Sequence, residues 1–115
     1  MQPMLDRKQI DFLHWHAVSK LRMGDFEASG TLFRLLKAVC PERTDIGLGF
    51  AYSLVRQGAL EEASAVVSEL RRRPMRPEEM ALLGRLHRRC EFESRRLERA
   101  GRHATRSQAT TGEAA

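Results

Sequence analysis

Apolar side chains recur along this chain with the period of an α-helix. In the first pattern they stand three or four residues apart, at Ile10, Leu13, Ala17 and Leu21. This spacing places them on one face of a helix with 3.6 residues per turn. Similar patterns cover about residues 32–39, 45–57 and 59–72, and another begins at residue 77. The sequence therefore predicts an all-α chain of amphipathic helices.

Two segments share a layout, GDFEASGTLFRLLKAVCP (residues 24–41) and GALEEASAVVSELRRRP (residues 58–74). Each opens on a glycine, Gly24 or Gly58, and closes on a proline. Glycine permits the positive φ that a tight helix end favours, whereas proline ends a helix. Each unit predicts a helical hairpin, in which Asp25 caps one helix and Thr44 or Asp45 caps the next.

Small residues occupy matching places in the two units. Antiparallel helices approach to about 8 to 10 Å only where the side chains at their crossing are short. Four residues are predicted to lie at such crossings: Ala17, Ser29, Ala51 and Ala63.

A third, degenerate unit begins at Pro77, which suits the first position of a helix. Its later apolar residues are sparse among arginines, as in a terminal cap or a helix that needs a partner. From residue 102 no apolar periodicity remains. We expect a helical domain over residues 1–101 and a disordered basic and polar tail over residues 102–115.

Positive charge is concentrated in the second half of the chain. The net charge is +5, and residues 71–106 hold twelve basic and five acidic side chains. Such a segment can attract phosphates or an acidic partner, or it can form a solvated face.

The sequence contains no membrane span, because no apolar run approaches the roughly 18 residues that a span needs. The first twenty residues carry charges instead of an apolar signal core, so we expect a cytosolic chain without membrane insertion. Cys40 and Cys90 are too few for a disulfide framework and are predicted to be free thiols.

Catalysis and metal binding find little support in the residues. His14 and His16 point about 200° apart on a helix and cannot chelate one ion, and Trp15 between them is predicted to pack in the fold. His87 and Cys90 are three residues apart, but two ligands do not complete a tetrahedral site. We expect no enzyme activity, no cofactor and no metal, because phosphate loops, nucleophile elbows and paired carboxylates are also missing.

The interval from Gly24 to Gly58 is the length of a tetratricopeptide repeat, a helical hairpin of about 34 residues. With its glycine, small crossing residues and closing proline, the unit resembles that repeat. The likeness is good over residues 10–74 and poor over residues 77–100. Leu13 and Gly47 stand where that family carries an aromatic residue. The resemblance implies two clear repeats and one degenerate repeat, which form a short right-handed superhelix.

The opening stretch LDRKQIDFLHWHAVSKLRMGDFEAS is similar to that of the YscY (SctY) family of type III secretion chaperones, on Leu5, Gln9, Phe12 and Leu13. The resemblance implies a bacterial cytoplasmic chaperone. Such a chaperone binds and stabilises a small secreted export-apparatus protein, the X component, and helps deliver it to the export gate. A co-chaperone of the needle subunit or of the translocators is the alternative within the same machine.

Stacked helix pairs curve, and the first helix of each pair lines the inner face. Leu48, Tyr52 and Val55 form an apolar stripe that is either buried by other helices of the chain or takes an amphipathic helix of a partner. The predicted groove consists of His14, Val18, Leu21, Leu48, Tyr52, Val55, Ala81, Arg85 and Arg88.

Nucleic-acid binding is the alternative from another class of function. Phosphate contacts need little more than a row of basic side chains. The row in this chain is Arg85, Arg88, Arg89, Arg95, Arg96 and Arg99. The only Trp and Tyr lie elsewhere in the sequence, so nucleic acid is the less favoured partner.

Overall fold

The computed structural model describes residues 5–114, with side chains described through residue 103, and this part of the chain is all α-helical. Five helices follow one another: α1 (Arg7–Arg22), α2 (Phe26–Val39), α3 (Thr44–Gln57), α4 (Leu60–Leu70) and α5 (Pro77–Ala114). The all-α prediction is confirmed.

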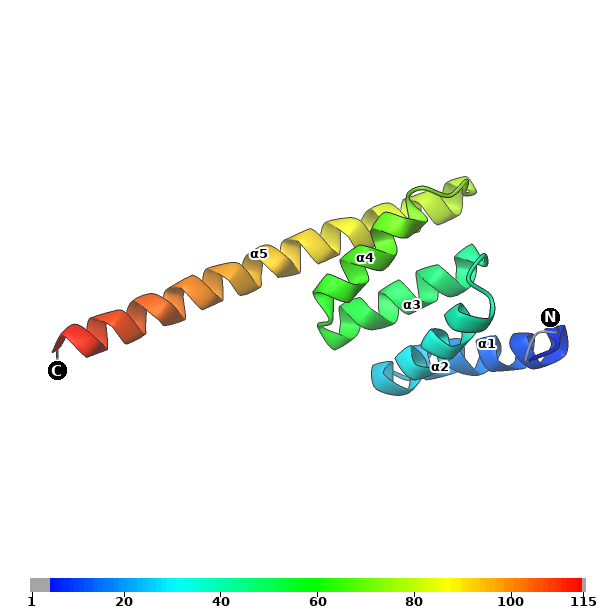
Figure 1. Ribbon diagram of the computed structural model, residues 1–115, viewed down its shortest axis with the longest axis horizontal. Helices are drawn as coiled ribbons and strands as arrows, with labels where there is room; N and C mark the ends of the chain where they lie inside the picture. Colours follow the sequence, from blue (N-terminus) through cyan, green and yellow to red (C-terminus); the bar gives the residue numbers. More distant parts are fainter. Residues whose placement is uncertain (1–4, 115) are drawn as a thin grey trace.

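The helices pack as successive hairpins (Figure 1). α1 pairs with α2 and α3 pairs with α4, while α2 and α4 each also contact the helix that follows them. α3 further contacts α1 and α5, so these three helices lie together on one side of the body. The C-terminal half of α5 projects beyond the other helices (Figure 1), which makes the molecule 64 Å long and 29 × 27 Å across.

The two hairpin turns are built in the same way, at matching places in the two units. Gly24 has a φ of +83° and Gly58 a φ of +80°. In each turn the residue after the glycine donates its backbone N–H to the carbonyl five residues earlier, at 2.9 Å. This arrangement satisfies the last carbonyls of a helix and favours glycine. The predicted turns are confirmed, and so is the cap by Asp25, whose carboxylate accepts the N–H of Ala28 at 3.2 Å.

The predicted cap of α3 is wrong. Arg43 occupies the N-cap position of α3, and its side chain makes no cap hydrogen bond. Asp45 lies inside the first turn, where its carboxylate accepts hydrogen bonds from the Arg43 guanidinium at 2.7 Å and from the N–H of Ile46 at 2.9 Å. The Asp45 carboxylate therefore binds both Arg43 and one first-turn N–H from a position inside the helix.

Close helix crossings form the core. All four predicted crossing residues are fully buried: Ala17, Ser29, Ala51 and Ala63. The Ser29 and Ser53 hydroxyls hydrogen-bond at 3.0 Å between α2 and α3. A Cβ on Gly47 would come within 2.8 Å of Leu70 in α4, so α3 and α4 meet too closely there for the aromatic that the family resemblance expects.

Surface ion pairs also join the hairpins. Arg34 of α2 binds Glu62 of α4 through two hydrogen bonds of 2.6 and 3.1 Å. Lys37 binds Glu69 between the same helices at 3.0 Å. The hydrogen bond from Arg34 lowers the pKa of Glu62, and that from Lys37 lowers the pKa of Glu69.

A single long helix stands where the degenerate third unit was expected. The residue one repeat length after Gly58 is Phe92, which lies inside α5. No glycine is present there to turn the chain, so the helix continues. The sequence predicted a disordered tail from residue 102, whereas the structure extends α5 to Ala114. Adding residues to a helix that has already formed is easier than starting one, and this favours the extension.

Gly58→Ala is expected to lower the free energy of unfolding by about 1 kcal/mol, because an L-residue at this positive φ is strained. Gly84→Ala is the matched control. Gly84 lies inside α5, where a Cβ would meet only the Arg88 guanidinium at 3.6 Å. The control should therefore raise the free energy of unfolding by up to about 1 kcal/mol. Urea denaturation measures both variants, and an equal effect from both would contradict the turn geometry.

Candidate binding groove

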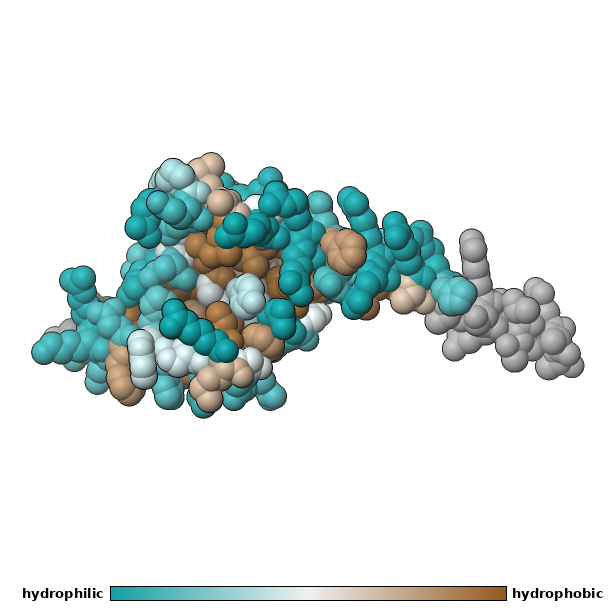
Figure 2. All heavy atoms as spheres, turned by 180° about the vertical axis from the view of Figure 1, so that it is seen from behind, coloured by the Kyte–Doolittle hydropathy of each residue, from teal (hydrophilic) through white to brown (hydrophobic). Residues whose placement is uncertain are grey.

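A groove of about 460 Å³ lies between α1, α3 and α5. Its lining residues are Leu21 and Arg22 of α1, Asp45, Leu48, Gly49 and Tyr52 of α3, Arg76 just before α5, and Glu79 and Leu82 of α5. Figure 2, which views the molecule from behind, shows an apolar area in the middle of the body with polar side chains around it. The groove thus combines an apolar floor with a charged rim.

Helix geometry brings the apolar floor together. Leu48 and Tyr52 are four residues apart on α3 and therefore share a side of that helix. Leu21 reaches the same space from the last turn of α1, and Leu82 reaches it from the second turn of α5. Leu48 is only 5% exposed, whereas Tyr52 is half-buried. Tyr52 is thus the floor residue on α3 that a ligand could cover further.

The rim carries both signs of charge. Arg76 pairs with Glu79 at 3.4 Å, and Asp45 pairs with Arg43 at 2.7 Å. His14 lies 3.8 Å from the same Asp45 carboxylate. Burial alone would raise the pKa of Asp45, but the hydrogen bond and charge of Arg43, aided by His14, hold the pKa below its usual range. The Asp45 carboxylate is therefore stabilised as an anion.

Acidification below about pH 4 is expected to reduce the stability of the fold. The folded-state pKa of Asp45, Glu62 and Glu69 is lowered, so the stabilisation is present above the unfolded-state pKa of about 4 and is lost as the pH falls through the folded value. Their side chains are 42 to 44% exposed, so each contributes at most about 1 kcal/mol.

Urea denaturation at a series of pH values measures this loss. Asp45→Asn removes one of the three carboxylates, so its stability should fall less steeply with acid than that of the unchanged chain. Parallel curves for the two proteins would contradict the role of Asp45.

Three of the predicted groove residues, Leu21, Leu48 and Tyr52, lie together in the groove. Val55 is buried, with 6% exposed, and belongs to the core. Val18 is partly buried and packs against the same core. The apolar stripe of α3 is therefore divided, because the body of the protein buries Val55 while Tyr52 stays accessible.

The other predicted groove residues lie outside the lining. His14 faces Asp45 and meets the ring of Phe33 edge-on, with 5.9 Å between ring centroids. Ala81, Arg85 and Arg88 are exposed on α5 but do not line the groove.

Sequence reasoning missed Leu82, Gly49 and the four charged residues of the rim. It placed the inner face of α5 on Ala81, whose side chain is short, whereas the next residue along, Leu82, forms the wall. Leu83 and Leu86 face the core, so Leu82 is the leucine of the ALLGRLH stretch that remains for the groove. Elimination of the two core-facing leucines could therefore have identified Leu82 from the sequence.

An aromatic cluster covers part of the outer surface of α1. His16 stacks on Phe12 and on Trp15, with ring centroids 6.0 and 6.3 Å apart. Trp15 is 65% exposed, so the prediction that it packs in the fold is wrong. No group of three or more His, Cys, Asp or Glu residues within the described part of the chain is placed to hold a metal ion.

Both cysteines are buried free thiols, as the sequence predicted. Burial raises the pKa of Cys90, although a hydrogen bond with Ser64 of α4 opposes the shift. No helix in the described range has the length and apolar character to cross a membrane.

No protein family, curated protein or solved structure matches the chain. Its function is therefore inferred from its own residues and their geometry.

Proposed function

We propose that this chain is a binding chaperone, which holds an amphipathic helix of one partner protein in the groove between α1, α3 and α5. The observation that carries the proposal is the apolar floor of the groove, where Leu21, Tyr52 and Leu82 converge from three helices. Apolar residues on one face of a ligand helix would cover this floor, as in other helix-in-groove complexes. The rim charges would set its direction and register.

We further propose that the hairpins form a short right-handed tetratricopeptide-like superhelix. The matching turns at Gly24 and Gly58, one repeat length apart, support a true structural repeat. The shared contacts of α1, α3 and α5 support an inner face lined by the first helix of each unit. Concave inner faces of this kind are the usual binding surfaces of helical-repeat proteins.

The proposed partner is a small secreted protein of a type III secretion system, of the X-component type. This choice rests on the similarity of the opening stretch to the YscY family. In the bacterial cytoplasm the chaperone would cover an aggregation-prone apolar helix of the partner until delivery to the export gate. The needle subunit and the translocators are the alternative partners within the same machine.

The groove is assigned no catalytic role. Its acidic groups are already engaged, Asp45 with Arg43 and Glu79 with Arg76. Paired charges of this kind hold an orientation but leave no free base beside a nucleophile.

Co-expression with a candidate X component tests the proposal. We expect the two proteins to co-purify, and the free energy of unfolding of the chaperone to rise by about 2.7 kcal/mol at a partner concentration 100 times the Kd. A parallel preparation with an unrelated secreted protein is the control. Separate elution together with an unchanged melting temperature would contradict the proposal.

A second candidate function, nucleic-acid binding, is favoured by the geometry of α5. All six arginines of the row from Arg85 to Arg99 are exposed on this one helix, which projects from the body. A salt titration against duplex DNA and RNA separates the two functions. Tight binding that weakens steeply with salt would favour nucleic acid, and no binding at about 50 mM salt would eliminate it.

A further inference from the structure

α5 repeats the arrangement of α3 when Pro77, its first residue, is aligned with Thr44, the first residue of α3. On α3, Ser53 and Gln57 hydrogen-bond to α2, the helix that precedes it, at 3.0 and 2.7 Å. Their counterparts on α5 are Leu86 and Cys90, which are 4% and 2% exposed. The Cys90 side chain hydrogen-bonds with Ser64 of α4. The face of α5 that carries Leu86 and Cys90 therefore packs against the preceding helix, as the face with Ser53 and Gln57 does on α3.

An adjacent face of α3 packs against α4, the other helix of its hairpin. Gly47, Ala51 and Leu54 follow one another on this face, and Gly47 lies directly against Leu70 of α4. Ala51 and Leu54 are 0% and 2% exposed, so α4 and its neighbours seal this side of α3.

The corresponding face of α5 is open. In the same alignment, the positions of Gly47, Ala51 and Leu54 are taken on α5 by Met80, Gly84 and His87. Met80 is 61% exposed, and a Cβ on Gly84 would meet only the Arg88 guanidinium. α5 packs against α3 and α4 and against no further helix of the described chain.

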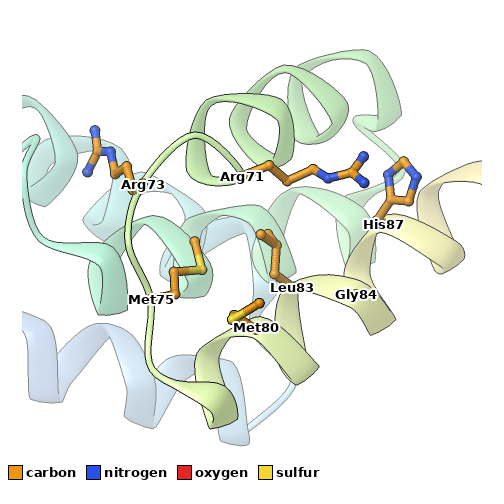
Figure 3. Close-up of a pocket in the computed structure, with 7 residues that line it drawn as sticks. All are labelled: Arg71, Arg73, Met75, Met80, Leu83, Gly84 and His87. Atoms are coloured by element: carbon orange, nitrogen blue, oxygen red, sulfur yellow. The ribbon is translucent and has the colours of Figure 1, made fainter.

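This face forms one side of a pocket of about 280 Å³, here named the α5 pocket (Figure 3). Its lining residues are Arg71, Arg73, Met75, Met80, Leu83, Gly84 and His87. Figure 3 shows Met75, Met80 and Leu83 around one end, while the Arg71 side chain extends toward His87 at the other. The α5 pocket shares no residue with the groove.

We propose that an acidic amphipathic helix of a partner protein packs on the α5 pocket and completes the third hairpin from outside the chain. Gly84 is the crossing residue, in the place that Ala51 takes on α3. Without a Cβ at this point, a second helix can approach α5 closely. Met80 and the partly exposed Met75 supply the apolar contact, beside the buried Leu83.

Within the described residues α5 has no turn from which the chain could fold back onto the pocket, so the proposed occupant is a separate chain. The residues of α5 that correspond in position to Gly58 are Glu91 and Phe92, and both lie inside the helix. The chain therefore runs away from the pocket where a hairpin would bring it back (Figure 1).

The charges around the pocket identify the occupant as acidic. Arg71, Arg73 and Arg88 surround the open face of α5. Arg73 pairs with Glu69, which also pairs with Lys37, whereas Arg71 and Arg88 have no acidic partner among the described side chains. α4, which fills the equivalent face of α3, carries Glu61, Glu62 and Glu69 between Leu60 and Leu70 and no basic residue.

A second copy of this chain fits the pocket poorly. Apart from Leu35 of α2, the exposed large apolar side chains of the described chain outside the pocket lie on α1, at its C-cap or on α5. α1 carries four basic residues and one acidic residue between Arg7 and Arg22, and α5 carries more basic than acidic side chains. Like charges would repel such a copy from Arg71 and Arg88.

A peptide with the sequence of residues 59–70, held helical by a staple on its polar side, is the probe. It is titrated into the intact chain, in which the methionine methyl groups are labelled with ¹³C for NMR. We expect saturable shifts of the Met75 and Met80 signals, while Met23, which is 74% exposed on the first hairpin, stays unchanged. Gly84→Trp should weaken this binding at least tenfold and leave the fold intact, because the added side chain enters open space.

One comparison separates this inference from the proposed function, and a second tests the charge of the occupant. Tyr52→Asp alters the groove alone and should leave the binding of the peptide unchanged. A peptide in which lysine replaces the three glutamates should bind at least tenfold more weakly.

The inference would be overturned if the Met75 and Met80 signals did not move at millimolar peptide. It would also be overturned if Gly84→Trp bound the peptide as tightly as the unchanged chain, or if the lysine peptide bound as tightly as the glutamate peptide. Loss of binding in Tyr52→Asp would place the peptide in the groove and would overturn it too. If the chain self-associates and Gly84→Trp abolishes that self-association, the pocket is a contact between two copies of the chain, and the inference is overturned.

Discussion

Phe33→Ala is expected to lower the free energy of unfolding by about 3 to 5 kcal/mol. Phe33 is 0% exposed and lies where three helices meet. Its ring rests against Gly49 of α3 and meets His14 of α1 edge-on. Small domains are stable by about 5 to 15 kcal/mol in total, so this one cavity removes a large share of the stability. Urea denaturation followed by circular dichroism measures the loss.

Leu35→Ala is the matched control, because Leu35 stands on the same helix and is 46% exposed. Leu35→Ala should lower the free energy of unfolding much less than Phe33→Ala does. A double-mutant cycle with Gly49→Ala sharpens the test. A Cβ on Gly49 would collide with the Phe33 ring, so Gly49→Ala should destabilise the unchanged chain but be tolerated beside Phe33→Ala. The expected coupling is about 0.5 to 3 kcal/mol, and additive effects would contradict the packing.

Tyr52→Asp is expected to weaken partner capture at least tenfold. Full burial of a large apolar side chain contributes about 1.5 to 3 kcal/mol, and covering the exposed part of the half-buried Tyr52 contributes roughly half of that. About 1.4 kcal/mol corresponds to a factor of ten in affinity. The new carboxylate would also have to lose water beneath an apolar helix, which adds to the loss. Isothermal titration of the purified chain with the co-purifying partner measures the effect.

Phe92→Asp is the control for this substitution, because it also exchanges an aromatic for a carboxylate. Phe92 is 66% exposed on α5 and does not line the groove. Circular dichroism should show equal helix content in both variants. Leu48→Asp is unsuitable, because Leu48 is 5% exposed and a buried carboxylate would unfold the chain. Undiminished capture by Tyr52→Asp would exclude the groove as the binding surface.

The local features of the fold could be predicted from the sequence because single residues determine them. Gly24 and Gly58 are needed for positive φ, and Pro77 is favourable at the start of a helix. The four crossing residues were identified because only short side chains fit between close helices. Each of these predictions depends on a few neighbouring residues and on no distant contact.

The features that the sequence did not reveal depend on how helices tilt against one another. Val55 and Tyr52 belong to one apolar stripe, yet the tertiary packing buries the first and leaves the second accessible. The choice of Leu82 over Ala81 as a groove wall depends on the rotation of α5. The role of Asp45 depends on Arg43, which competes with the helix end for the carboxylate. Hydrophobic periodicity defines the faces of a helix but does not determine these angles.

The succession of neighbouring hairpins has a kinetic consequence. Every helix packs only against helices one or two places away in the chain, so the contacts are short in sequence separation. Proteins with such low contact order fold in microseconds to milliseconds, because little loop-closure entropy opposes them. The first hairpin can therefore assemble at the ribosome before α5 has been synthesised.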